Sequence, residues 1–60
     1  MRTYKFEIRR DGELEDAVDD GEAAIQRAEL LDAETGAVEV FKVGYPLAGV
    51  VSRERIWPVL

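Results

Sequence analysis

The chain of 60 residues contains no cysteine and no histidine, and these two absences exclude several kinds of site. No disulfide can form, so a domain this small depends on packing or on self-association for its stability. An ordinary zinc site is excluded too, because zinc in proteins is held mainly by cysteine and histidine. The commonest general base and the thiol nucleophile are also missing. The sequence therefore predicts a non-enzymatic protein without a cofactor or a metal.

Long apolar runs are absent as well. No segment approaches the roughly 18 apolar residues that a membrane-spanning helix needs. The first ten residues alternate apolar and charged side chains without a continuous apolar centre, which is not typical of a signal peptide. With 47% hydrophobic and 35% charged residues, the chain has the composition of a globular protein. We expect a single soluble domain spanning residues 1–60 and located in the cytoplasm.

Negative charge is abundant and unevenly distributed, within a net charge of −5. Between residues 11 and 22 there are seven acids and no base: Asp11, Glu13, Glu15, Asp16, Asp19, Asp20 and Glu22. Such a surface disfavours nucleic acid and anionic membranes as direct partners. It favours a basic partner protein, and a small acidic protein can also imitate nucleic acid in a groove built for phosphates.

One segment, residues 20–34, has a helical pattern. Its apolar side chains recur at the spacing that places them on one helix face, with Leu30 widening the stripe at one edge; the others are Ala24, Ile25, Ala28 and Leu31. Asp19 and Glu22 fit a capping box, with Val18 and Ala23 as a hydrophobic staple, and Asp20 is an equally good N-cap. Gly36 suits the left-handed position after the last turn.

The remaining segments have strand and turn patterns. Alternation predicts a strand over residues 3–9, and the Asp11-Gly12 dipeptide after it predicts a hairpin to a short acidic edge strand over residues 13–18. After the helix, strands are predicted over residues 37–43 and 47–52, separated by a turn at Gly44-Tyr45-Pro46.

The strand at 37–43 is predicted to be central, because it is apolar on both faces. Val38 and Val40 point one way and Phe41 and Val43 the other, so we expect a bulge or burial of both faces. The chain thus reads as an α+β domain in ββαββ order. One helix is expected on one face of an antiparallel sheet of three to four strands.

The last residues, 55–60, form an apolar tail. Its candidate partner-binding side chains are Ile56, Trp57, Val59 and Leu60, flanked by Arg53 and Arg55. Pro58 cannot donate to a central ladder, which favours an edge strand or an extended arm. Trp57 either covers the chain's own core or anchors a second copy, and the small core favours the second copy. In that dimer the two arginines pair with the acidic hairpin of a partner subunit.

Three functions follow as hypotheses. The first is a protein-binding module that forms a homodimer through its tail. The alternative is an acidic inhibitor or nucleic-acid mimic, of the kind that phages encode, which binds a basic protein. A third is calcium binding, since acids fall at positions 1, 3, 5, 9 and 12 of an EF-hand-like loop over residues 11–22; against it, Asp16 stands where such a loop needs glycine.

Overall fold

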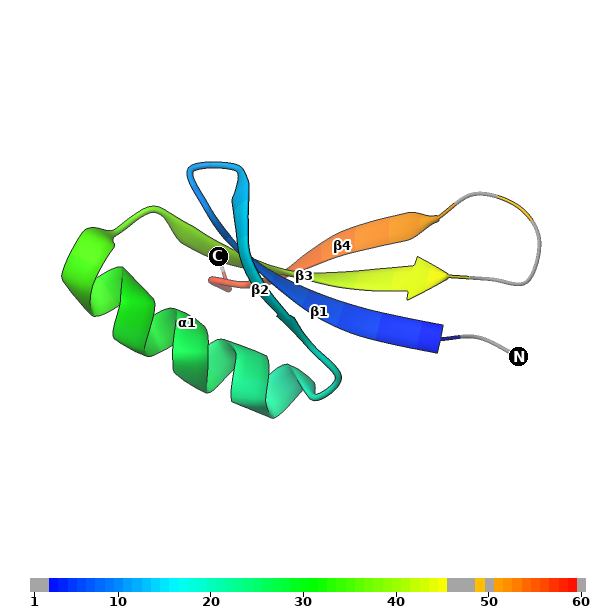
Figure 1. The fold of residues 1–60 in the computed structure, drawn as a ribbon, viewed down its shortest axis with the longest axis horizontal. Helices are drawn as coiled ribbons and strands as arrows, with labels where there is room; N and C mark the ends of the chain where they lie inside the picture. The colour runs from blue at the N-terminus through cyan, green and yellow to red at the C-terminus, as the bar shows by residue number, and fades with distance from the viewer. Residues whose placement is uncertain (1–2, 46–48, 50, 60) are drawn as a thin grey trace.

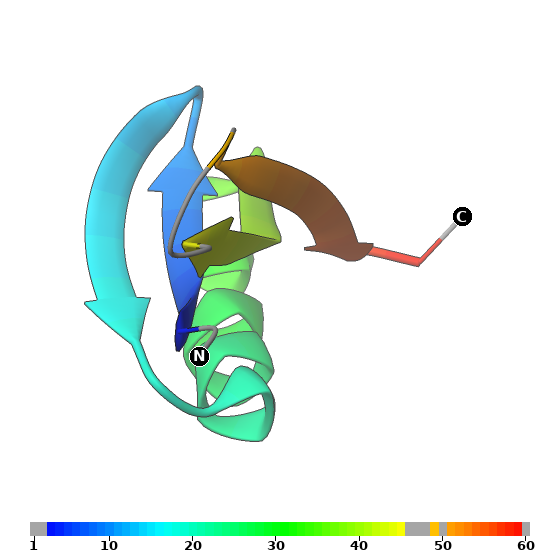
Figure 2. The ribbon, with the colours of Figure 1, turned by 90° about the vertical axis from the view of Figure 1, so that its right-hand side faces the viewer.

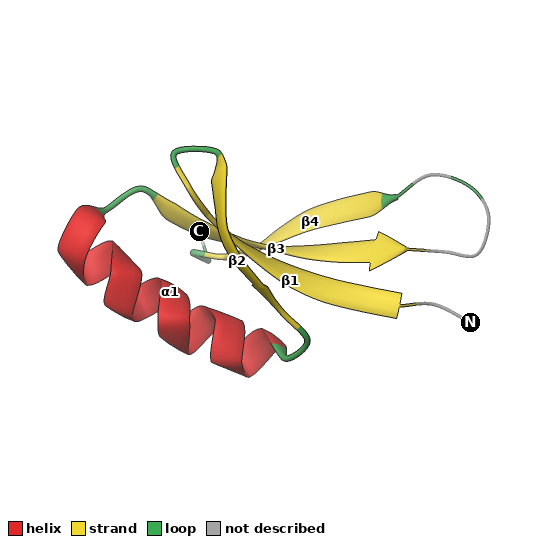
Figure 3. Ribbon diagram, viewed as in Figure 1, coloured by secondary structure: helices red, strands yellow, loops and turns green. Residues whose placement is uncertain are grey.

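The computed structural model describes residues 3–45, 49 and 51–59. They form a four-stranded antiparallel sheet in the order β2-β1-β3-β4, with one helix on one face (Figures 1 and 3). The elements are β1 (Thr3–Arg10), β2 (Glu13–Val18), α1 (Gly21–Thr35), β3 (Val38–Tyr45) and β4 (Ser52–Trp57). The predicted α+β class and ββαββ order are confirmed. Within the described residues, no helix is both long and apolar enough to cross a membrane.

The β1–β2 hairpin turns at Asp11-Gly12, as predicted. Both residues have positive φ, 52° for Asp11 and 84° for Gly12. Positive φ at both central positions is what a two-residue hairpin turn of the I′ type requires, and its twist matches that of the strands. The backbone N–H of Asp11 also donates to the carbonyl oxygen of Ala37 at 3.1 Å, which ties the turn to the segment after α1.

Gly12→Ala is expected to lower the free energy of unfolding by about 1 kcal/mol, the cost of a Cβ in the left-handed region. Nothing lies within 4 Å of the position a Cβ would take there, so the effect comes from the backbone alone. Asp11→Asn is the matched control, because asparagine tolerates positive φ, and it should leave stability unchanged. Urea unfolding followed by circular dichroism measures both variants. Equal stability of Gly12→Ala and the parent would contradict the assigned turn.

Both edges of the sheet carry a bulge. The β1–β2 register passes from Ile8↔Asp16 to Arg9↔Leu14, which leaves Glu15 as the extra residue of β2. The β3–β4 register shifts between Val40 and Phe41, where the predicted irregularity of β3 lies, and the extra residue, Ile56, belongs to β4. The central β1–β3 ladder is regular. Bulges and charged side chains on edge strands oppose pairing with another sheet.

The fourth strand lies later than predicted, which is a correction. Gly49 is at a bend and β4 begins at Ser52, whereas Leu47, Ala48 and Val50 lie outside the described residues. The predicted turn is also wrong in part, because Gly44 and Tyr45 belong to β3; Pro46 is outside the described residues. Gly44 pairs with Tyr4 on one side and Ser52 on the other.

Close packing explains why the strand has a glycine at position 44. A Cβ at Gly44 would lie 2.7 Å from the Oγ of Ser52 and 3.4 Å from the ring of Tyr4.

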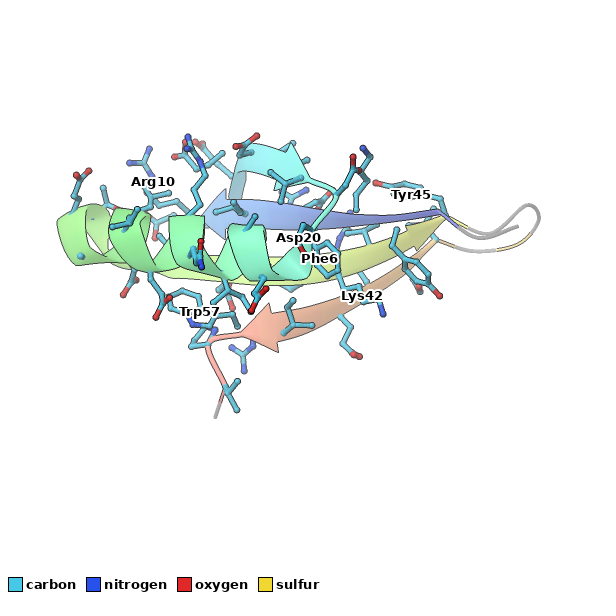
Figure 4. The ribbon with its side chains drawn as sticks, turned by 90° about the horizontal axis from the view of Figure 1, so that it is seen from below. Phe6, Arg10, Asp20, Lys42, Tyr45 and Trp57 are labelled. Carbon is cyan, nitrogen blue, oxygen red and sulfur yellow. The ribbon has the colours of Figure 1, made fainter. Side chains whose placement is uncertain are left out.

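The end of β3 follows β1 to the first described residue, because Tyr45 pairs with Thr3. At this end Lys42 and Tyr45 lie beyond the N-terminal end of α1 (Figure 4). The Nζ of Lys42 is 4.4 Å from the centre of the Tyr4 ring.

The core lies between α1 and the sheet. Its buried members are Ile8, Ala24, Ala28, Val38 and Val40, with Phe6, Val18, Leu31, Ile56 and Trp57 partly buried against them. The two alanines confirm the predicted helix face. Leu30 corrects it: its side chain is 74% exposed. A helix turns by about 100° per residue, which carries Leu30 well away from the direction of the two alanines.

The helix begins at the second of its two candidate caps. Asp20 is the N-cap, and its Oδ1 accepts from the N–H of Glu22 at 3.3 Å. Because Asp20 is the N-cap, Glu22 is the second helical residue and not the third, so the capping box predicted from Asp19 and Glu22 is not formed. The carboxylate of Asp19 pairs with the Nζ of Lys5. At the other end Gly36 has φ 72°, and its N–H donates to the carbonyl of Asp32 at 2.8 Å, as a helix stop requires.

Candidate protein-binding surface

Most carboxylates of the chain belong to the segment that forms the β1–β2 turn, β2 and α1, and β2 contacts α1 in the folded chain. Figures 1 and 2 show β2 at one edge of the sheet and α1 across one of its faces. Residues 11–35 contain ten acids and one base, a net charge of −9. The remaining residues contain three acids and seven bases, a net charge of +4, and the two together give the −5 of the chain. The term acidic surface is used below for the carboxylates of the β1–β2 turn, β2, the Asp19-Asp20 connection and α1.

The seven acids predicted from sequence all belong to the acidic surface, and three of them have a cation nearby. The Nζ of Lys5 pairs with Asp19, the Nη2 of Arg10 lies 2.8 Å from Glu15, and the Nε of Arg27 lies 3.2 Å from Asp16. Among the described residues no cation pairs with the other four, Asp11, Glu13, Asp20 and Glu22. Exposed ion pairs contribute little to stability, so these three pairs add little to the folding of the domain.

The sequence reasoning missed the acids of the helix. Glu29, Asp32 and Glu34 are exposed on α1 and extend the acidic surface past residue 22. The sequence did indicate that the helix is acidic, because its single base is Arg27. What the sequence did not show is that β2 contacts the helix, so that charged residues of both elements line one groove.

The acidic segment is extended over much of its length. Residues 13–18 form β2, and the turn before it follows a strand rather than a helix. Within the described part of the chain, no three carboxylates are grouped as a metal site. The acids therefore form a spread surface rather than a single point of high charge.

A shallow groove lies in the acidic surface, between α1 and β2. Its volume is about 220 Å³, and its lining residues are Glu15, Arg27, Leu30, Leu31 and Glu34. Leu30 and Leu31 supply the apolar lining, the first largely exposed and the second partly buried. The charged side chains of the lining come from both elements, so the groove exists only once the hairpin has packed beside the helix.

The opposite face of the sheet carries paired charges. Side chains alternate along a strand, so Glu7 points away from the helix-facing Phe6 and Ile8. Glu7 is only 8% exposed, and its Oε1 lies 3.0 Å from the Nε of Arg9 and 3.5 Å from the Nε of Arg53. In the same way, the Nη1 of Arg55 lies 3.3 Å from the Oε2 of Glu39. The two candidate arginines thus have partners across their own sheet.

The apolar tail is divided. Ile56 and Trp57 are partly buried against the core of their own chain, and Trp57 pairs with Val40 and lies beside the helix (Figure 4). Val59 is 85% exposed. Leu60 lies outside the described residues. Two of the four predicted partner-binding residues therefore have an intramolecular role.

Comparison of the chain with protein-family models, with curated proteins and with solved structures finds no match. Function is therefore inferred from the two surface properties just described. These are the concentration of negative charge on the turn, β2 and α1, and the groove between β2 and α1.

Proposed function

We propose that this protein is a small, non-enzymatic binding module of the cytoplasm that engages a basic partner protein through its acidic surface. The observation that carries the proposal is the concentration of negative charge on the segment that forms the turn, β2 and α1: its net charge is −9, and Lys5 and Arg10 of β1 offset only two of its carboxylates. A field of one sign on one side of a small protein steers and orients a partner of opposite sign. It also repels partners of like sign.

The arrangement of the carboxylates favours a partner with an extended basic groove. They follow β2 and the adjacent helix instead of clustering at one point. A protein that binds nucleic acid presents such a groove, with cations spaced along it for phosphates. We propose that this protein, when bound, competes with nucleic acid for the basic groove of its partner.

Affinity capture on the immobilised protein, followed by measurement of the affinity of the captured partner as salt is raised, tests the proposal. We expect a basic protein whose affinity falls steeply with ionic strength, because exposed charges are screened beyond about 10 Å at 0.1 M salt. We also expect a nucleic acid to displace the module. A neutral or acidic partner, or an affinity that salt leaves unchanged, would contradict the proposal.

A homodimer through the tail receives less support from the geometry than the acidic surface does. Ile56 and Trp57 pack on their own core, and the neighbouring edge strand is bulged and carries Arg53, Glu54 and Arg55. We therefore expect light scattering at tens of micromolar protein to give the 6.8 kDa mass of a monomer. A mass twice as large that reverts to the monomer in Val59→Asp would restore the predicted dimer.

A further inference from the structure

The groove between β2 and α1 combines an exposed leucine with charged side chains. Leu30 is 74% exposed, and Leu31 beside it is partly buried against the core. A volume of about 220 Å³ lies below the few hundred Å³ that drug-sized ligands usually occupy. The groove is therefore of a size for one or two side chains of another protein, rather than for a free small molecule.

The charges that line the groove indicate the chemistry of a partner segment that could bind there. Arg27 is held by Asp16 at 3.2 Å, and Glu15 is held by Arg10 at 2.8 Å. Glu34, the remaining charged residue of the lining, has no cation among the described residues. The uncompensated charge here is negative, and the whole surrounding segment is strongly acidic. A partner segment with a lysine or arginine next to an apolar residue complements this negative charge.

Two other occupants fit less well. A second copy would bring its own acidic surface against this one, because a twofold interface places the same patch on both sides. The described C-terminal residues of the same chain follow β4, at the opposite edge of the sheet from β2. A basic segment of a partner protein is the occupant that the charges favour.

We infer that the groove lined by Glu15, Arg27, Leu30, Leu31 and Glu34 takes an apolar side chain from a basic segment of the partner. The inference rests on the proposed function and narrows it. The acidic surface attracts the partner, and the groove selects a segment in which an aliphatic or aromatic residue is flanked by lysine or arginine. Burial of apolar area depends weakly on salt, so this contact persists where the charge attraction is screened.

Two synthetic peptides with a fluorescent label probe the groove directly. One is a lysine-rich peptide with a central leucine, and the other has glycine in place of that leucine. Fluorescence anisotropy at low and at near-physiological salt measures their dissociation constants. We expect the leucine peptide to bind about tenfold more tightly, the order of effect that partial burial of one leucine produces, and to keep this advantage at the higher salt.

Leu30→Ser tests the assignment of the groove, and Leu14→Ser is the matched control. Leu14 is also exposed, at 53%, but it pairs with Arg9 and does not line the groove. We expect Leu30→Ser to abolish the tenfold preference while leaving the binding of the glycine peptide unchanged. Leu14→Ser should retain the preference. Both side chains are exposed, so the thermal midpoint should stay close to that of the parent.

The outcomes separate the groove from the acidic surface. Equal binding of the two peptides, or a preference that survives Leu30→Ser, overturns the groove and leaves the acidic surface standing. Absence of binding by either peptide at low salt overturns both. A self-associated form that weakens in Leu30→Ser and not in Leu14→Ser identifies a second copy as the occupant, and this also overturns the inference.

Discussion

Trp57→Ala is expected to lower the free energy of unfolding by about 3 kcal/mol, at the low end for loss of a large core aromatic because the side chain is only partly buried. The indole packs against the core and lies opposite Val40, which is fully buried. A 60-residue domain has a total stability of about 3 to 9 kcal/mol, so the variant should lose a third or more of it and unfold at a clearly lower urea concentration than the parent. Urea unfolding followed by circular dichroism is the measurement.

Val59→Ala is the matched control from the same tail. Its side chain is 85% exposed, so the change should stay within about 0.5 kcal/mol. Both results should be independent of protein concentration, since the packing of Trp57 is within one chain. A small effect at Trp57, or an unfolding midpoint that rises with concentration, would contradict the intramolecular packing and favour docking on a second copy.

Removing two carboxylates from the acidic surface is expected to weaken binding of the captured basic partner about tenfold, as for charges at a complementary interface. The variant is Glu13→Gln/Glu34→Gln, which takes one acid from β2 and one from α1. Both carboxylates are exposed and have no cation among the described residues, so the fold should be unaffected. Titration calorimetry at low salt gives the two affinities.

The matched control changes net charge by the same amount on the other side of the fold. Glu54→Gln/Val59→Lys also raises the net charge by two, by removing one negative charge and adding one positive charge at or beyond β4. We expect it to reduce affinity much less, because screening limits the reach of exposed charges to about 10 Å at 0.1 M salt. Equal losses in the two variants would mean that net charge, and not the acidic surface, decides binding.

Local patterns predicted most of the fold correctly. The alternation of residues 3–9, the Asp11-Gly12 turn and the spacing of Ala24 and Ala28 each reflect a single element and its buried face. The fourth strand was misplaced because its residues do not look like a strand. Arg53 and Arg55 are on β4 through its ladder with β3, and their side chains pair with Glu7 and Glu39 across the sheet. The apolar run before them resembled a strand more closely.

The candidate site was predictable only in its hairpin half. The acids between residues 11 and 22 are adjacent in sequence, so their charge is visible there. The acids of α1 join those of the hairpin, and the groove forms, only when β2 and α1 pack together. This tertiary contact is not visible in the sequence. Leu30 was expected at one edge of the apolar stripe of the helix, next to Leu31. Its exposure depends on which side of the helix the sheet covers.

Amide chemical-shift mapping tests the central claim most directly, because it reports which residues a basic partner contacts. Uniformly nitrogen-15-labelled protein would be titrated with the captured partner or, in its absence, with the lysine-rich peptide carrying leucine. We predict that the largest shifts fall in β2 and α1, around Glu15, Leu30 and Glu34, and diminish in the variants that lose Leu30 or the two carboxylates. Shifts concentrated in β3, β4 and the tail instead would contradict the proposed acidic binding surface.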